Sequence, residues 1–462
     1  MDFKEKNVLV YGSGISGIAA SRLLLKMYAN VYLYDESTTK DADALVQCVF
    51  KSNGKPLFEA GERGELKIIL GEISNGIIND IDLVVMSPGV PLDIPQVELF
   101  KRRGIPLWGE VELAYEAGKG SILAITGTNG KTTTTAMLGE IMRSYHKETY
   151  VVGNIGIPYT GVALETTDES IIVAETSSFQ LETIHNFKPK VSSILNITPD
   201  HLDRHHTMEA YIEAKEKIAE NQNSEDICVL NYDNAITRDF GKRVKSQVVF
   251  FSKYEELGRG VYLADGSIIV NFKNREILCH VDELSILGEH NYENVMAAAA
   301  MSIAFGVPVD VVRKAVISFK GVAHRLEFVT KKNNVTYFND SKATNPDSAI
   351  RGIQAMNRPT VLIGGGFDKN SEYHGWIEAF ENKVKVLVLV GETKNKIAKT
   401  ARALGFNHII IEDSFDEAVK TSMEIARSGD AVLLSPACAS WDMFENYEER
   451  GDRFKTLVLG ED

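Results

Sequence analysis

The chain has few cysteines, and none of them are spaced as a pair. Its 462 residues include four cysteines with no CxxC motif among them: Cys48, Cys228, Cys279 and Cys438. Scattered thiols of this kind indicate a reducing compartment. They argue against a disulfide framework and against a zinc site.

Long apolar runs, a leader and an excess of basic charge are also lacking. The first residues, MDFKEKNVLVYG, carry charges and then a short strand pattern, and no run reaches transmembrane length. The 50 Lys and Arg are outnumbered by 64 Asp and Glu, and the net charge of −14 argues against general nucleic-acid or anionic-membrane binding. No internal repeat or low-complexity segment is found. We therefore expect a cytoplasmic, monomeric protein with neither membrane nor nucleic-acid partners.

What the chain does have is a phosphate-binding pattern in residues 121–135, SILAITGTNGKTTTT. An apolar strand pattern precedes the glycines, and a helix pattern follows from Thr133. Backbone N–H groups of such a turn and the helix N-terminus attract phosphate, while Lys131 would reach the terminal phosphates and the Thr132 hydroxyl would bind Mg²⁺. An incidental glycine turn is the alternative, since Ile125 stands where the common pattern has its first glycine. The predicted ATP-binding loop is Gly127, Thr128, Asn129, Gly130, Lys131, Thr132 and Thr133.

A second glycine motif lies near the N-terminus. The strand pattern NVLVY is followed by GSGISG, by a helix pattern from Ile18 to about Tyr28, and by a second strand that ends at Asp35. This order predicts a Rossmann-like nucleotide site, with NAD or FAD and other nucleotides as open alternatives. Ser87 and Gly89 follow a later strand, and they either serve the same crevice or close a simple turn.

Polar side chains follow two further strand patterns beyond the phosphate loop. Glu175 ends the run IIVAE, and His201 lies in NITPDHLDRHH after the run VSSIL. Both side chains would meet the loop at the carboxyl ends of parallel strands, where Mg²⁺ ligands are needed. A structural role for His201 is the equal alternative.

The helix pattern from Met208 to about Glu220 places Lys215 on its apolar face. Such a lysine either extends its ammonium group to solvent or is buried with a lowered pKa. Asn291 and Asn294 share one face of an alanine-rich helix that runs to about Phe305. There they could bind adenine or cap the helix.

The strand and helix patterns predict an α/β protein of three domains, over residues 1–117, 118–321 and 322–462. The first would be a Rossmann-like parallel sheet. The second would be an ATP-binding domain of the phosphate-loop type with a small antiparallel region at 245–285, and the third would be Rossmann-like again. Polar residues gather after strand patterns of the third domain: Asp340, Lys342, Thr344, Lys369 and Ser440.

Together these motifs resemble those of the Mur ligases of peptidoglycan synthesis, and more distantly those of the folylpolyglutamate synthetases. The motifs are GTNGKTT, ETSSFQ, NITPDHLDRH, GEHNYEN, HRLE and NDSKATNP, in that order. Within the family, GEVEL, the SPG turn and LLSPACASWDMF are similar to the members that add D-glutamate to UDP-N-acetylmuramoyl-L-alanine. The alanine-adding members typically have His where this chain has Asn129.

The resemblance implies that the N-terminal domain binds UDP instead of a dinucleotide. It implies uridine contacts at Ile15, Ser16, Glu36 and Ser37, and contacts near the diphosphate at Ser87, Gly89 and Asn154. At positions 36 and 37 the family commonly has Thr-Arg, so these two contacts rest on a departure from its pattern.

The resemblance also implies an ATP site and two Mg²⁺ ions. Lys131 and Thr132 would serve the phosphates, Glu175 one Mg²⁺, and His201 the other. Lys215 would be carbamylated by CO₂ and would hold the second Mg²⁺. The remaining implied contacts on ATP are Asn291, Asn294, Arg325 and Asp340, and those on D-glutamate are Lys342, Thr344, Lys369, Ser440 and Tyr447. Tyr447 replaces the usual Phe, and its hydroxyl needs a partner.

The implied reaction joins a carboxylate to the amine of D-glutamate through an acyl phosphate and a tetrahedral intermediate. The alternatives are a Mur-type or folylpolyglutamate-type ligase for another amino acid, or an NAD-dependent dehydrogenase.

Overall fold

The computed structural model describes residues 2–460 except 53–54, 59–62, 287 and 370. The chain forms two compact units. The first comprises Met1–Leu278 with Glu293–Ala315, and the second comprises Cys279–Tyr292 with Val316–Asp462. The predicted domain limits at 117/118 and 321/322 stay predictions.

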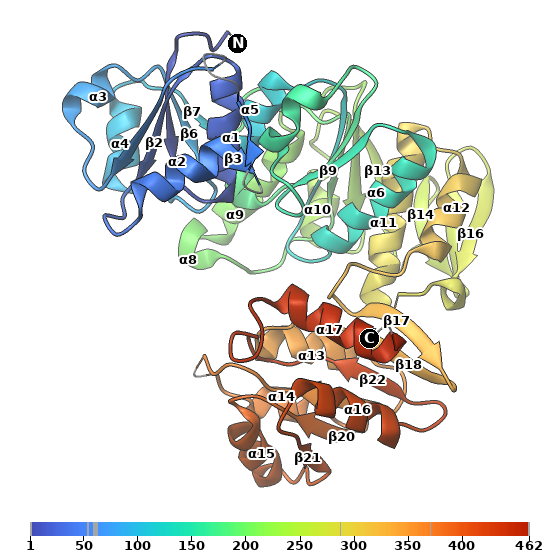
Figure 1. Ribbon diagram of the computed structural model, residues 1–462. Helices are drawn as coiled ribbons and strands as arrows, with labels where there is room; N and C mark the ends of the chain where they lie inside the picture. Colours follow the sequence, from blue (N-terminus) through green and yellow to red (C-terminus); the bar gives the residue numbers. More distant parts are fainter. Residues whose placement is uncertain (1, 53–54, 59–62, 287, 370, 461–462) are drawn as a thin grey trace. The chain divides into compact units, whose positions relative to one another are not determined.

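The first unit begins with a parallel sheet in the order β5-β2-β1-β6-β7 (Figure 1). Both faces are covered, because alternate residues of β1 enter different cores: Val8 and Val10 lie in one cluster, Leu9 and Tyr11 in another. Its strands are β1 (Asn7–Tyr11), β2 (Asn30–Asp35), β5 (Leu66–Leu70), β6 (Leu83–Met86) and β7 (Leu107–Gly109). Its helices are α1 (Ile15–Lys26), α2 (Ala42–Phe50), α3 (Asn75–Asn79), α4 (Pro95–Arg102) and α5 (Glu110–Ala117), with a ribbon of β3 (Lys51–Ser52) and β4 (Lys55–Pro56).

A larger mixed sheet follows in the order β16-β15-β14-β13-β12-β11-β8-β10-β9. Its strands are β8 (Ser121–Thr126), β9 (Thr149–Gly153), β10 (Ile171–Glu175), β11 (Val191–Ile194), β12 (Ile227–Asn231), β13 (Gln247–Ser252), β14 (Gly260–Ala264), β15 (Ser267–Asn271) and β16 (Arg275–His280). The α-helices of this part are α6 (Lys131–Tyr145), α7 (Ser178–Leu181), α8 (Leu202–His205), α9 (Met208–Glu216), α10 (Ala235–Phe240), α11 (Glu289–Phe305) and α12 (Val309–Ser318). Short 3₁₀ turns are η1 (Tyr159–Gly161), η2 (Ala163–Glu165), η3 (Lys217–Ala219) and η4 (Val281–Glu283).

The antiparallel region predicted for 245–285 begins later than expected. β14 and β15 do pair antiparallel, but β13 pairs in parallel with both β12 and β14. Helix α10 lies between β12 and β13, and a crossover of this kind returns the chain in a parallel direction. Strand residues alone do not distinguish the two directions.

The first two sheets share a hydrophobic core. One cluster contains Val10 of β1, Leu113 of α5 and Ile172 of β10, all fully buried. Because α5 contributes to both sides of this core, the two sheets belong to one unit.

The second unit is built on a sheet in the order β17-β18-β22-β19-β20-β21, in which only β17 runs antiparallel to its neighbour. Two hydrophobic clusters cover its faces, one with Leu362 and one with Val361 of the same strand. Its strands are β17 (Glu327–Lys332), β18 (Val335–Asn339), β19 (Thr360–Gly364), β20 (Val384–Leu389), β21 (Ile409–Ile411) and β22 (Ala431–Leu434). Its helices are α13 (Pro346–Gln354), α14 (His374–Glu378), α15 (Lys394–Ala403), α16 (Phe415–Ile425) and α17 (Tyr447–Leu459).

None of the helices in the described part of the chain combines the length and the apolar character needed to cross a membrane.

Candidate active site

The predicted phosphate loop lies between β8 and α6. Gly130 is the N-cap of α6 with φ of 84°, and a Cβ there would lie 2.2 Å from Oδ1 of Asn294. Both the left-handed backbone and this close approach require glycine. Lys131 Nζ donates to the carbonyl oxygens of Gly127 at 2.9 Å and Thr128 at 3.0 Å. The ammonium group therefore lies over the loop that it was predicted to serve.

Asn196, which the sequence analysis did not single out, holds the loop in shape. Its carbonyl oxygen accepts from Thr128 N at 2.9 Å. Its side-chain Oδ1 accepts from Asn129 N at 2.8 Å, and its Nδ2 donates to Asn129 O at 3.1 Å. Its position directly after a strand, in a run already noted for its polar residues, was the available signal.

Lys215 is buried, with only 2% of its surface exposed. Its Nζ donates to Gly127 O at 2.8 Å and lies 4.6 Å from the ring centre of Tyr211. Burial, with the nearby charge of Lys131, lowers the pKa of Lys215 to about 7. The ammonium group does not extend to solvent, so the buried alternative describes this side chain.

Tyr211 connects three parts of this region. Its hydroxyl lies 3.1 Å from Oγ1 of Thr128, and its ring centre lies 6.4 Å from that of His201. Tyr211 precedes Lys215 by four residues, and this spacing on the apolar face could have identified it.

Glu175 ends β10 beside the phosphate-loop strand, in register with Ile125 of β8. The side chain is 1% exposed, and its Oε1 accepts from Asn154 Nδ2 at 2.8 Å. Its Oε2 is buried and has no hydrogen-bond partner among the described residues. Buried carboxylate oxygens normally have partners, so this atom is suited to a cation.

His201 lies in the left-handed region, with φ of 52°, at the start of α8. Its ring is exposed, packs edge-on against Phe179 at 5.0 Å, and lies 3.5 Å from a carboxylate oxygen of Asp200. A ring so placed can bind a ligand from solvent.

The donors predicted for Mg²⁺ include one buried carboxylate, that of Glu175. The described residues contain no group of three or more His, Cys, Asp and Glu that could hold a metal ion. Mg²⁺ is usually bound by one or two carboxylates together with phosphate oxygens and water. The carboxylate of Glu175 is a group of that kind.

Asn291 and Asn294 both lie inside α11, which begins at Glu289, so neither caps this helix. Asn294 is 5% exposed, and its Oδ1 accepts from Thr134 Oγ1 of α6 at 3.2 Å. This bond connects α11 to the helix that follows the phosphate loop.

The N-terminal glycine turn ends in an exposed apolar side chain, Ile15, at the start of α1. The acid predicted after the second strand, Asp35, accepts from Lys40 Nζ at 2.6 Å and Ser13 Oγ at 2.7 Å. Burial opposes ionisation, but these hydrogen bonds outweigh it and hold the pKa of Asp35 well below its usual range. The carboxylate of Asp35 thus already accepts hydrogen bonds from Ser13 and Lys40.

The neighbours of Asp35 are placed differently. Glu36 is exposed and accepts from the hydroxyl of Tyr11. Burial and this hydrogen bond raise the pKa of Tyr11 above its ordinary value. Ser37 Oγ lies 3.0 Å from Oγ1 of Thr39, while Ser16 is half-buried.

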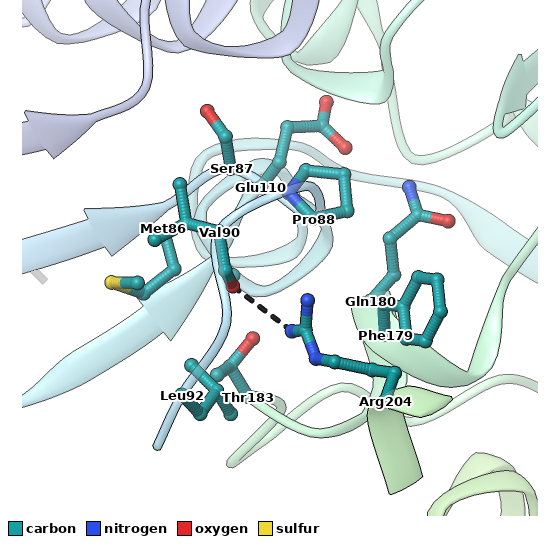
Figure 2. A pocket seen from close by; sticks show the side chains of 11 residues that line it. Met86, Ser87, Pro88, Val90, Leu92, Glu110, Phe179, Gln180, Thr183 and Arg204 are labelled. Carbon is teal, nitrogen blue, oxygen red and sulfur yellow. Dashed lines mark hydrogen bonds between the residues drawn. The ribbon is translucent and has the colours of Figure 1, made fainter. Parts of the chain in front are cut away.

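The SPG turn closes the glycine motif and lines a small cavity (Figure 2). Ser87 Oγ donates to Gly12 O at 3.1 Å, so this hydroxyl has a structural role, whereas Gly89 is exposed. Across the cavity, Arg204 Nη2 donates to Val90 O at 2.9 Å. The cavity therefore lies between the turn after β6 and the segments that contain α7 and α8.

In the second unit, Asp340 is buried after β18. It accepts from Ser435 Oγ at 2.8 Å and Leu326 N at 3.2 Å. Burial raises the pKa of Asp340 to about 7 despite these donors. Arg325, one residue before Leu326, is exposed.

The hydroxyl group of Tyr447, which needs a hydrogen-bond partner, has one. Lys342 Nζ donates to Tyr447 Oη at 2.8 Å and lies 4.7 Å from its ring centre. Burial, with the neighbouring Glu448, raises the pKa of Tyr447 to about 12, so the hydroxyl stays protonated.

The other predicted D-glutamate residues lie on loops at the ends of strands. Thr344 is half-buried, Ser440 is 1% exposed, and the exposed Lys369 has its Nζ 4.5 Å from the ring centre of Trp441.

Arg450, a residue that the sequence analysis missed, connects two of these loops. It is 1% exposed; its Nε donates to Ser341 Oγ at 2.9 Å, and its Nη1 donates to Cys438 O at 3.1 Å. Burial lowers the pKa of Arg450 to about 10, which leaves it charged at neutral pH. Its spacing to Phe454 and Val458, at i, i+4 and i+8, was the signal that placed it on the buried face of α17.

Comparison with known protein families matches the chain in three successive parts. These are a Mur ligase MurD-like N-terminal domain over residues 6–109, a Mur ligase middle domain over 125–302, and a Mur ligase glutamate ligase domain over 324–438. The chain is 51% identical over 459 residues to the UDP-N-acetylmuramoylalanine–D-glutamate ligase of Lachnoclostridium phytofermentans, and 51% identical over 460 residues to that of Lachnospira eligens. Each match covers 99% of both chains.

Solved structures show the same fold at lower identity. The UDP-N-acetylmuramate–alanine ligase of Thermotoga maritima matches 99% of this chain and 100% of its own, with a TM-score of 0.59 and 20% identity. A D-alanyl-D-alanyl-adding ligase of Acinetobacter baumannii matches 98% of this chain and 93% of its own, with a TM-score of 0.59 and 18% identity. The fold thus has three α/β domains.

Proposed function

Because this chain belongs to the Mur ligase family, we propose that it adds D-glutamate to UDP-N-acetylmuramoyl-L-alanine with conversion of ATP to ADP and inorganic phosphate, in peptidoglycan precursor synthesis. The full-length identity of 51% to ligases of this name carries the assignment. The phosphate loop, with Lys131, Lys215 and Glu175 around it, supplies the groups that an ATP-dependent ligase needs. The site does not favour a dehydrogenase, since Asp35 is engaged by Lys40 and Ser13.

The difficulty of the reaction is that a carboxylate is a poor electrophile. In the proposed mechanism, the carboxylate of the alanyl group attacks the γ-phosphate of ATP, forms an acyl phosphate and releases ADP. Lys131 would balance the negative charge of the transferred phosphoryl group. The amine of D-glutamate then attacks the acyl carbon, and the tetrahedral intermediate expels inorganic phosphate.

Two Mg²⁺ ions would be held near the phosphate loop, one by Glu175 and Thr132 and the other by His201 and Lys215. When bound, Mg²⁺ neutralises phosphate charge and fixes the orientation of the transferred group. The buried, partnerless Oε2 of Glu175 supports the first of these sites. For the second, Lys215 must become an anion, as a carbamate formed with CO₂. An amine whose pKa is about 7 has the neutral form that reacts with CO₂.

The remaining proposed contacts fall into three groups, one for each substrate. Ile15, Ser16, Glu36 and Ser37 would contact the uridine, and Ser87, Gly89 and Asn154 the diphosphate side. Asn291, Asn294, Arg325 and Asp340 would contact ATP. For D-glutamate the proposed residues are Lys342, Thr344, Lys369, Ser440 and Tyr447, where ammonium and hydroxyl groups suit the two carboxylates of that substrate.

Three further parts of the proposal are that the enzyme is monomeric, that it works in the cytoplasm, and that its domains divide near residues 117 and 321.

The test is ATP-dependent phosphate release with UDP-N-acetylmuramoyl-L-alanine and a panel of D-Glu, L-Glu, L-Ala, L-Lys and meso-diaminopimelate. Release with D-Glu alone is the expected result. Release with a different amino acid would contradict the assigned substrate but keep the ligase chemistry. No release with any of them would overturn the proposed function.

A further inference from the structure

Two lysines proposed for D-glutamate, Lys342 and Lys369, contact aromatic rings. Lys342 meets Tyr447, as described above, and Lys369 Nζ lies 4.5 Å from the ring centre of Trp441. A carboxylate partner would neutralise such a lysine and would compete with a carboxylate ligand. An aromatic face attracts the ammonium group and restrains it, yet leaves its positive charge in place.

The surroundings of Lys369 preserve that charge. The neighbouring acid Asp368 is paired with Lys396, whose Nζ lies 3.0 Å from Oδ2 of Asp368. Lys369 has no carboxylate within ion-pair distance among the residues that the structure describes. Its ammonium group instead faces the ring of Trp441.

The loop that carries Trp441 is fixed on both sides of the indole. Before it, Ala439 O accepts from Phe367 N at 3.0 Å; after it, Asp442 Oδ2 accepts from Glu392 N at 2.9 Å. The ring itself is 61% exposed and tilted against Phe367, with the ring centres 5.6 Å apart. The indole is thus exposed, while the backbone on both sides of it is held by hydrogen bonds.

We propose that Trp441 is a positioning residue for D-glutamate: its ring holds the ammonium group of Lys369 where that group can bind a carboxylate of the amino acid. Ser440, directly before Trp441, is among the residues proposed to contact the same substrate. The inference rests on the proposed function, because it concerns the amino-acid site of that reaction. It adds to that site a residue that touches the lysine and not the substrate.

The kinetic test compares Trp441→Leu, Trp441→Phe and the wild type. Trp441→Leu should raise the KM for D-glutamate about three- to fivefold, the upper part of the range expected for losing a cation–π contact at an exposed site. Trp441→Phe keeps an aromatic face and should recover part of the loss. The kcat and the KM values for ATP and the UDP substrate should stay within about twofold, which a general structural defect would not allow.

Tyr254 offers a matched control. It is 72% exposed, and Lys253 Nζ lies 4.7 Å from its ring centre, but it follows β13 in the first unit. Tyr254→Leu removes a similar exposed contact and should leave the KM for D-glutamate unchanged.

Fluorescence gives a readout that does not depend on turnover. Of the three tryptophans, Trp108 and Trp376 are buried and Trp441 is exposed. With the UDP substrate and a non-hydrolysable ATP analogue present, D-glutamate should protect the indole from acrylamide quenching, and Trp441→Phe should lose this change. L-glutamate should give no protection.

The outcomes separate the two proposals. If the wild type releases no phosphate with D-glutamate, the proposed function fails and this inference fails with it. If the wild type is active and Trp441→Leu keeps its KM for D-glutamate, only the role of Trp441 is overturned. An equal rise in all three KM values would also overturn it, since that result indicates a structural role.

Discussion

At the scale of single residues, Lys215 and Lys131 both donate to the carbonyl oxygen of Gly127. Two ammonium groups on one acceptor repel each other, and the buried one is the easier to deprotonate. This repulsion favours the neutral amine of Lys215, which is the form that the proposed reaction with CO₂ requires.

If Lys215 holds Mg²⁺ as a carbamate, as proposed, Lys215→Ala should lower kcat by about two orders of magnitude or more, because a bound metal ion contributes several kcal/mol of charge stabilisation. The control is Lys217→Ala, which removes a bond from Nζ to Glu182 O at 3.0 Å in the same segment. Carbon-13 NMR with labelled CO₂ should show a carbamate signal in the wild type that Lys215→Ala lacks. Near-wild-type turnover of Lys215→Ala would contradict the carbamate.

Asp340 gives the second unit a pH-dependent stability. The folded protein keeps this carboxyl protonated up to a pKa of about 7, whereas the unfolded chain releases the proton near the ordinary value of 3.8. The folded state binds more protons between these values, so the contribution of Asp340 to stability is fully present below pH 4 and is lost as the pH rises through 7. Each unit of pKa corresponds to about 1.4 kcal/mol, which makes the total effect a few kcal/mol.

Asp340→Asn should remove this dependence, since an amide does not titrate. The difference in Tm between wild type and Asp340→Asn should favour the wild type more at pH 5 than at pH 8. Asp413→Asn, at an exposed carboxylate of the same unit, serves as the control. A difference that does not change with pH would show that Asp340 is ionised throughout.

At the scale of elements, α5 carries a buried carboxylate that joins the first sheet to the second. Glu112 is 0% exposed and accepts from three backbone N–H groups: His185 at 2.8 Å, Asn186 at 2.7 Å and Phe187 at 3.0 Å. The carboxylate of Glu112 thus accepts from three successive backbone N–H groups, which buried backbone requires.

Glu112→Ala should destabilise the first unit by at least about 3 kcal/mol. It leaves three backbone N–H groups without an acceptor, and each such group costs about 1–3 kcal/mol. Glu112→Gln keeps one acceptor oxygen and should lose less. Glu116→Ala, on the same helix, gives up an exposed bond from Asn186 Nδ2 and is the matched control. Thermal melting measures all three, and equal Tm values for Glu112→Ala and Glu116→Ala would contradict the role of Glu112.

The elements around the site were largely predictable, and their contacts were not. The periodicity that placed Lys215 on the inner face of α9 depends only on local spacing. The bond from Asn154 to Glu175 and the contact between Gly130 and Asn294 join residues far apart in the chain, so no local pattern contains them. The spacing of Arg450 to Phe454 and Val458 indicates its buried face, but its partners, Ser341 and Cys438, lie on other loops that no local pattern contains.

At the scale of the whole molecule, the two units are interleaved in sequence. Residues 293–315 return to the first unit after the chain has entered the second. Their helix, α11, buries Val295 and Met296 completely, and Glu293 lies 3.4 Å from Nδ2 of Asn231 in β12. The first unit therefore ends at residue 315 and not at the last strand of its sheet.

A fragment of residues 1–315 should melt cooperatively, whereas residues 1–278 should melt at a lower temperature or without a cooperative transition. The shorter fragment lacks α11 and leaves the apolar groups that α11 covers exposed to water. Differential scanning calorimetry of the two fragments distinguishes them. A 1–278 fragment as stable as 1–315 would show that α11 is dispensable for this unit.

The same interleaving has a consequence for how the protein is made. During translation, residues 279–292 leave the ribosome before residues 316–462 of their unit have been synthesised. The first unit is completed in the meantime, so the second unit is always the last to assemble. A stop codon anywhere before position 315 consequently leaves both units incomplete, and a later stop codon damages the second unit alone.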